Sequence, residues 1–266
     1  MDFPLLNEVQ ETSELCEIHG VAKVKLKDFE PFCLECQKEK RDQMEQERVK
    51  DMFDRNYRRK TIETLKLDSI VGDIKLWDAD FKNYIPDNEE SETALAAARK
   101  FAYEYLDREK KFNTIFSGVP GVGKSHLAMS MVKAINEHFD PYGSCLFISV
   151  NDLMRLIKDS FNNPQSKYTE MNMVHLLSKV DVLVLDDLGS ESSFKRDNRE
   201  AGEYIQQVLF GVLNARQRTI ITTNLNSEEL ESIYNPKIVS RIYKGVENHI
   251  IKFTEATKDK RSKIVF

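Results

Sequence analysis

A glycine-rich segment in the middle of the chain constrains the fold and the chemistry more than any other feature. Residues 118–125 read G-V-P-G-V-G-K-S and match the pattern G-x-x-x-x-G-K-[ST] at every fixed position. Residues 113–117 before it are typical of a short buried strand, and residues 126–135 after it carry apolar side chains at helical spacing. Strand, glycine-rich turn and helix in this order predict a phosphate-binding P-loop.

Each residue type in such a loop has a physical task. Glycines let the backbone turn sharply and bring its N–H groups against phosphate oxygens, and the following helix directs its N-terminal dipole at the same anion. We expect Lys124 to reach the β- and γ-phosphates of ATP and the Ser125 hydroxyl to ligate Mg²⁺. The predicted nucleotide-binding residues are Gly118, Val119, Pro120, Gly121, Val122, Gly123, Lys124, Ser125 and His126. The alternative, a glycine-rich turn that carries Lys-Ser by chance, does not account for both flanks.

A second buried strand, at 180–189, ends in paired carboxylates, which is the Walker B pattern. We expect Asp186 to hold Mg²⁺ through water and Asp187 to orient or polarise the attacking water. Glu191 is a second candidate for the role of Asp187. An acidic turn after a core strand is the alternative interpretation.

Three polar residues further along the chain complete the predicted catalytic set. Asn224 follows the buried strand 218–223, where it would contact the γ-phosphate and the water. Arg241, on the short helix 235–242, would reach the γ-phosphate of a neighbouring subunit and neutralise charge in the transition state. A surface salt bridge is the alternative for Arg241. Arg261, in the basic tail, would act as a sensor within its own chain, in competition with the other cations there.

Four residues near the amino terminus have the spacing of a metal site. Cys16 and His19 form one pair and Cys33 and Cys36 form the other, each with two intervening residues. Two such pairs can bind one zinc ion tetrahedrally, and with all four positions filled the ion is structural rather than catalytic. Metal binding would supply folding free energy to a segment too small for its own core. Three free thiols and a surface histidine are the alternative.

The region between the cysteines and the P-loop contains a charged run. Residues 37–66 hold ten Lys/Arg and seven Asp/Glu without Gly or Pro, which predicts a solvated helix with i,i+4 charge pairs. A DNA contact by residues 55–60 is the alternative to a solvated face. The predicted domains are a zinc module over 1–36, a helical linker over 37–66 and a nucleotide-binding domain over 67–266.

Weaker patterns give further expectations. Trp77, Phe81 and Tyr84 precede the P-loop and would either cover adenine or pack in the core. Asn151 or Asp152 would cap a helix after the strand 143–150. The last predicted strand covers residues 248–253.

The composition limits location and partners. The formal net charge of −5 argues against a broadly basic surface for indiscriminate nucleic-acid binding, so any grip on DNA must be local. The first residues lack a basic signal-peptide region, and no run approaches the ~18 apolar residues of a membrane span. Three of the four cysteines fall in the metal pattern, which favours a reducing compartment. We therefore expect a cytoplasmic protein without a membrane partner.

The order of these motifs resembles the AAA+ class of P-loop ATPases. More narrowly, it resembles the DnaC/DnaI-type replicative helicase loaders, of phage or Gram-positive bacterial origin, and the related IstB transposition ATPases. The resemblance covers about residues 67–266 through GVPGVGKS, VLVLDDLGSE, TIITTN and SRI. It implies an α/β fold in which helices flank a parallel five-stranded sheet, without a C-terminal lid because the chain stops at Phe266. The Cys/His cluster is similar to the helicase-binding domain of DnaI-type loaders.

The resemblance also implies partners and a mechanism. The amino-terminal module would hold a hexameric replicative helicase while the ATPase subunits engage single-stranded DNA. Arg241 of the next subunit would complete each ATP site, so self-association and hydrolysis are coupled, and hydrolysis would release the helicase. In such loaders the segment between the Walker motifs lines the DNA path. The residues that offer cations and stacking rings there are Lys158, Phe161, Lys167 and Tyr168.

Three other functions stay open. An IstB-type transposition helper would bind duplex DNA and a transposase, and the zinc module counts against it. A small-molecule P-loop kinase would need an acceptor site and a mobile lid. An adaptor that binds ATP but scarcely hydrolyses it would lose nothing on substitution of Asp187.

Overall fold

The computed structural model describes residues 9–27, 29–192 and 202–260, which belong to two compact units. The first unit is Met1–Tyr57 and the second is Arg58–Phe266. Arg261, the predicted sensor, lies outside the described residues. Within the described part of the chain, no helix is long and apolar enough to cross a membrane.

The first unit contains a hairpin and the start of a long helix. Strands β1 (Val9–Leu15) and β2 (Ala22–Leu26) pair antiparallel, and helix α1 (Leu34–Lys60) follows. Helix α1 has no buried residue, as its high charge predicts. The buried apolar residues described in this unit are Cys16, Val24 and Cys33. The unit therefore has almost no hydrophobic core of its own, and the hairpin was not predicted from the sequence.

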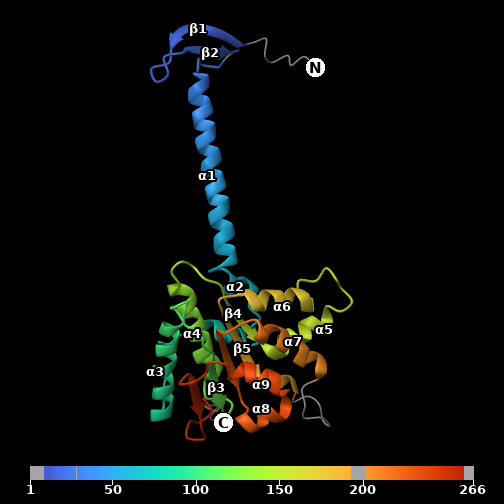
Figure 1. The fold of residues 1–266 in the computed structure, drawn as a ribbon. Coiled ribbons are helices and arrows are strands. Elements are labelled where there is room, and N and C mark those ends of the chain that lie inside the picture. The colour runs from blue at the N-terminus through green and yellow to red at the C-terminus, as the bar shows by residue number, and fades with distance from the viewer. Residues whose placement is uncertain (1–8, 28, 193–201, 261–266) are drawn as a thin grey trace, which may run out of the picture. The chain divides into compact units, whose positions relative to one another are not determined.

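The second unit is built on a parallel sheet of five strands (Figure 1). The strands are β3 (Thr114–Gly118), β4 (Cys145–Ser149), β5 (Val182–Leu188), β6 (Thr219–Thr223) and β7 (Ile250–Phe253). Their order across the sheet is β4-β5-β6-β3-β7, and every neighbouring pair is parallel. This confirms the predicted five-stranded parallel sheet.

The strands are apolar on both faces, and their period of two separates two cores. In β5, Val182 and Val184 face one core while Leu183 and Leu185 face the other. The first core contains helices α3 (Glu89–Glu104) and α4 (Lys124–His138). The other core contains the helices α5 (Val150–Asp159), α6 (Glu170–Lys179), α7 (Glu203–Asn214), α8 (Ser227–Ile233) and α9 (Pro236–Ile242). Figure 1 shows these two groups of helices on opposite sides of the sheet.

Short elements complete the second unit. They are α2 (Thr64–Asp68) and the 3-10 helices η2 (Ile74–Asp78) and η3 (Ser190–Ser192). After α2, the backbone of Ile70 forms an isolated parallel bridge with β4. The segment that leads to the P-loop is thereby fixed to the edge of the sheet.

The predicted cap of α5 at Asn151 or Asp152 is wrong. The helix begins at Val150 and its cap is Ser149, the last residue of β4. The Ser149 N–H still donates to the Ile70 carbonyl at 2.7 Å, so strand pairing continues to the residue before the helix. No loop separates the two elements, and hence there is no place for a polar cap further on.

Candidate nucleotide-binding site and metal cluster

The order of the strands brings three distant motifs to one edge of the sheet. Strand β3 leads into the P-loop, β5 carries Asp186 and Asp187 near its end, and β6 is followed by Asn224. Because the strands are parallel, their carboxyl ends meet at the same edge, where open α/β sheets bind ligands. Strand β6 lies between the other two, so Asn224 lies between the P-loop and the Walker B carboxylates.

Lys124, Asn224 and Asp187 form a continuous chain of hydrogen bonds. Lys124 is only 6% exposed. Its ammonium donates to the carbonyls of Gly118 and Val119 and to Asn224 Oδ1, each at 2.7 Å. Asn224 Nδ2 donates to Asp187 Oδ1 at 3.0 Å. One amide therefore connects the cation predicted to bind phosphate with the carboxylate predicted to orient water.

Asp186 lies where a magnesium ligand is expected. Its Oδ1 accepts from Thr222 Oγ1 at 2.6 Å, and the same hydroxyl accepts from the Asp187 N–H at 2.8 Å. Burial raises the pKa of the Asp186 carboxyl, and a hydrogen bond from Ser125 acts in the opposite direction. A buried carboxylate beside a hydroxyl is a donor set that suits Mg²⁺, whose charge would offset the cost of burying the anion. Thr222, which orients Asp186, was not predicted from the sequence.

Two glycines of the loop are required by the surrounding structure. Gly118 and Gly123 have φ angles of 126° and 99°, which side chains other than that of glycine rarely allow. A Cβ on Gly118 would collide with the backbone of Phe253, and one on Gly123 would lie 2.7 Å from the ring of Tyr84. The glycines that the motif specifies therefore permit close packing as well as the turn.

The predicted residues line a cavity of about 570 Å³. Those on its wall are Pro120, Gly121, Gly123, Lys124, Ser125, His126, Asp186, Asp187 and Asn224. Gly118, Val119 and Val122 lie behind the wall, where the first two accept from Lys124 and Val122 is fully buried. Much of the remaining wall comes from residues between Gly72 and Asp87, which the sequence did not single out as a group.

Of the three aromatic residues predicted to cover adenine or pack in the core, only Tyr84 lines this cavity. Its hydroxyl donates to the Val122 carbonyl at 3.2 Å, and burial raises the pKa of the phenol to about 12. Lys260 Nζ lies 3.9 Å from the centre of the ring. Trp77 and Phe81 pack against the core that contains α3 and α4.

Glu191, the second candidate for the water-orienting role, has other partners. Its carboxylate accepts from the hydroxyl of Tyr234 and, at 2.9 Å, from the N–H of Gly189. The side chain is buried, burial raises the pKa of its carboxyl, and it does not line the cavity. This geometry favours Asp187 over Glu191.

Arg241 does not line the cavity of its own chain. Its carbonyl accepts from Asn113, the residue that precedes β3, and its Nε donates to Asn214 at 3.0 Å. Arg241 therefore lies at the amino-terminal edge of the sheet, about 16 Å from the P-loop edge if each of the five residues of β3 rises ~3.3 Å.

The four predicted DNA contacts are in different environments. Lys158 and Lys167 are exposed, and Phe161 is 60% exposed with its ring edge-on to Tyr204. Tyr168 is half-buried, packs against the core and has Lys167 Nζ 4.8 Å from its ring centre. Phe161 is thus the more accessible ring for a base, and all four residues stay a prediction.

The predicted zinc ligands converge in the first unit. The ligand atoms of Cys16, His19, Cys33 and Cys36 all lie within 4.8 Å of one another. His19 Nδ1 is 3.3 Å from Cys36 Sγ and less than 4 Å from the other two sulfurs, while Nε2 lies 3.0 Å from Glu39 Oε1. The backbone N–H of His19 lowers the pKa of Cys16 to about 6, which favours the thiolate that zinc binds. Three sulfurs and one nitrogen fit a structural zinc site.

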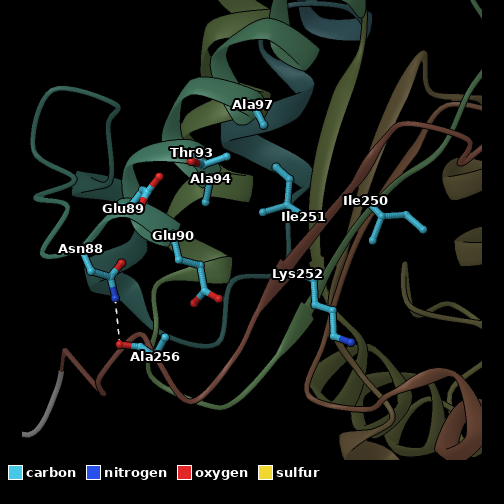
Figure 2. A pocket seen from close by; sticks show the side chains of 10 residues that line it. All are labelled: Asn88, Glu89, Glu90, Thr93, Ala94, Ala97, Ile250, Ile251, Lys252 and Ala256. Carbon is cyan, nitrogen blue, oxygen red and sulfur yellow. Dashed lines mark hydrogen bonds between the residues drawn. The ribbon is translucent and has the colours of Figure 1, made fainter.

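A second hollow, of about 550 Å³, lies between α3 and β7 (Figure 2). Asn88 Nδ2 donates to the Ala256 carbonyl at 2.9 Å, and Glu90 accepts from the N–H and hydroxyl of Thr254. These contacts hold the segment that leads to Lys260, whose N–H donates to the Gly121 carbonyl at 3.0 Å. No predicted site residue lines the hollow. Asn88 and Glu90 on its wall hold a segment that contacts the P-loop.

Comparison with solved structures identifies the fold of the second unit. A crystal structure of the DnaC helicase loader matches with a TM-score of 0.55 and 26% identity, over 68% of this chain and 99% of that one. A structure of DnaI matches with a TM-score of 0.55 and 23% identity, over 69% and 95% of the two chains. The sheet and its flanking helices therefore form an AAA+ fold of the kind seen in these proteins.

Comparison of sequences identifies the family. The replicative helicase loader DnaC of Escherichia coli strain K12 is 33% identical over 165 residues, which are 62% of this chain and 63% of the relative's length. The chain thus spans less than two thirds of the relative it matches. The model of the family described as IstB-like ATP binding protein matches residues 37–248. The chain belongs to this IstB-like ATP-binding family.

Proposed function

We propose that this protein is an ATP-dependent loader that places a replicative DNA helicase on single-stranded DNA. In this proposal residues 1–36 are the zinc module that binds the helicase, 37–66 are a helical linker and 67–266 are the ATPase domain. ATP binding and hydrolysis switch assembly and release.

The hydrogen-bonded chain from Lys124 through Asn224 to Asp187 is the observation that carries the proposal. It connects the residue predicted to bind the γ-phosphate with the residue predicted to act on water, which is what a nucleotide-dependent switch needs. Mg²⁺, held by Ser125 and Asp186, would neutralise charge on the phosphates. The similarity to a protein named replicative helicase loader supports the output we assign to this switch.

The surface of the first unit supports a protein partner. It exposes large apolar side chains close in sequence to the zinc ligands, with Ile18 79% exposed, Phe29 67% and Leu15 63%. Apolar side chains gathered on a small module are typical of a binding surface. We assign the helicase contact to this surface.

The position of Arg241 supports action in trans. At the amino-terminal edge of its sheet it is a strand's length from its own P-loop, which is farther than an arginine side chain reaches. We propose that Arg241 instead contacts the γ-phosphate of ATP bound to a neighbouring subunit. We propose that self-association completes each ATP site. We also propose that Phe161 and the exposed side chains of Lys158 and Lys167 contribute to DNA binding.

Gel filtration of the full chain with a hexameric replicative helicase tests the proposal. We expect the two proteins to co-elute, and we expect a chelator or Cys33→Ser to abolish co-elution. Cys145→Ala, which removes the cysteine outside the cluster, is the matched control. Absence of a complex with zinc present and the protein folded would rule out the loader function.

The family model also supports a second candidate, an IstB-type transposition helper. Such a protein would bind duplex DNA and a transposase. ATP-dependent binding to duplex DNA in preference to single strands, together with no helicase complex, would favour this candidate.

A further inference from the structure

The backbone of Arg241 is fixed by a buried asparagine. Asn113, which is 1% exposed, donates from Nδ2 to the Arg241 carbonyl at 3.1 Å and accepts at Oδ1 from the Thr219 N–H at 3.0 Å. The carboxyl end of α9 is therefore connected to the amino-terminal ends of β3 and β6. This contact places the Cα of Arg241 but leaves its long side chain to be oriented by something else.

A second asparagine contacts the guanidinium itself. Asn214, the last residue of α7, accepts from Arg241 Nε at 3.0 Å. Nε carries one of the five N–H donors of an arginine, and the two Nη groups carry the other four. These Nη groups make no hydrogen bond to another residue of the described part of the chain. The contact thus restricts the side chain and keeps the bidentate end available.

We propose that Asn214 is a positioning residue that holds Arg241 ready for the nucleotide of a neighbouring subunit. The inference rests on the proposed function, since it requires Arg241 to act in trans. An arginine has many rotamers, and docking on a phosphate costs the entropy of restricting them. A hydrogen bond that already orients Nε reduces this cost while the Nη groups bind the transition-state charge.

The structure supplies matched variants for a test. Asn214→Ala removes the acceptor, and Asn214→Asp keeps an acceptor oxygen at the same place. Gln217→Ala is the control. Gln217 and Asn214 both line a hollow of about 330 Å³, and the side chain of Gln217 makes no hydrogen bond to another described residue. Arg241→Ala removes the group that is being positioned.

Steady-state ATP hydrolysis and equilibrium ATP binding would be measured on the full chain at several protein concentrations. We expect Asn214→Ala to lower kcat by roughly tenfold, the effect of one lost hydrogen bond to a charged group, with the Kd for ATP unchanged. Asn214→Asp and Gln217→Ala should retain wild-type kcat. Arg241→Ala should lose about a thousandfold, as expected for an arginine finger.

Mixing two impaired proteins shows which subunit Asn214 serves. Lys124→Ala lacks a working P-loop but keeps the Asn214–Arg241 pair, whereas Asn214→Ala has the opposite defect. We expect an excess of Lys124→Ala protein to restore hydrolysis at the intact site of Asn214→Ala. An effect of Asn214 confined to its own chain would leave the mixture as slow as Asn214→Ala alone.

The outcomes separate this inference from the proposed function. Loss of activity in Arg241→Ala with wild-type kcat in Asn214→Ala would overturn the positioning role alone. Wild-type activity in Arg241→Ala would overturn the trans arginine as well. An equal loss in Asn214→Ala and Asn214→Asp would also contradict the inference, because the aspartate keeps the acceptor.

Discussion

The two sites of this protein are built in contrasting ways. The nucleotide site collects residues from β3, β5 and β6, which are far apart in the sequence and meet because two apolar cores hold the sheet. The metal cluster uses four residues within a short segment that has almost no buried apolar side chain. The first site is therefore maintained by the fold, whereas a zinc ion bound at the second would itself help to maintain the fold.

Removal of zinc should have the largest effect and should be confined to one unit. Zinc binding to structural sites contributes of the order of 10 kcal/mol, and the first unit has little else to stabilise it. We expect a chelator or Cys33→Ser to unfold β1, β2 and the start of α1 while ATP binding persists. Hydrogen exchange resolved by segment, with ATP affinity measured in parallel, checks this.

Acidification should act in the same direction as the chelator. The hydrogen bond with Cys16 raises the pKa of Cys36 to about 12, so zinc must displace a proton from Cys36 at neutral pH. The apparent zinc affinity should therefore fall as the pH is lowered. Loss of ATP binding together with zinc would contradict the separation of the two sites.

Lys124→Ala should have the next largest effect, on the other unit. It removes the cation between the P-loop carbonyls and Asn224. We expect the Kd for ATP to rise at least a hundredfold, which corresponds to a loss of about 3 kcal/mol of binding free energy. The zinc content should stay at one ion per chain. Calorimetric titration with ATP and metal analysis of the same sample measure both. Unchanged ATP affinity would exclude this cavity as the nucleotide site.

Asp187→Asn should divide binding from hydrolysis within the nucleotide site. The amide keeps the size of the side chain that accepts from Asn224 but loses the charge that would act on water. We expect kcat to fall about a hundredfold with little change in ATP affinity. Unchanged turnover would instead favour an adaptor that uses ATP binding alone.

Glu191→Gln is the matched control for that substitution. Glu191 contacts Tyr234 and Gly189 rather than the cavity, so we expect wild-type kcat and a lower melting temperature. A large loss of kcat in this variant would transfer the water-orienting role to Glu191.

Glu39→Ala should have the smallest effect and should sharpen the view of the metal cluster. Glu39 accepts from His19 Nε2, which leaves Nδ1 directed at the three sulfurs. Loss of such an outer partner weakens metal binding about tenfold or more. Competition with a chromogenic chelator measures this, and Glu35→Ala, on the same helix, is the control. Equal affinities of the two variants would show that the carboxylate of Glu39 does not orient the ligand.

The sequence by itself determined the parts of the molecule that depend on local pattern. The P-loop, the Walker B strand and the five buried strands follow from short motifs and apolar runs, because glycine freedom and period-two burial are local properties. The convergence of the Cys and His side chains in the first unit was predicted from spacing alone, because four such residues within a short segment have few other ways to meet.

The tertiary structure decided which of these parts meet. The order β4-β5-β6-β3-β7 places Asn224 between Lys124 and Asp187, and packing separates Tyr84, on the cavity wall, from Trp77 and Phe81, which pack against a core. It also placed Arg241 at the opposite edge of the sheet. Such relations join residues a hundred or more positions apart, as Lys124 and Asn224 or Asn113 and Arg241 are, and no local pattern contains them. They are set by the order in which the buried strands pair in the sheet.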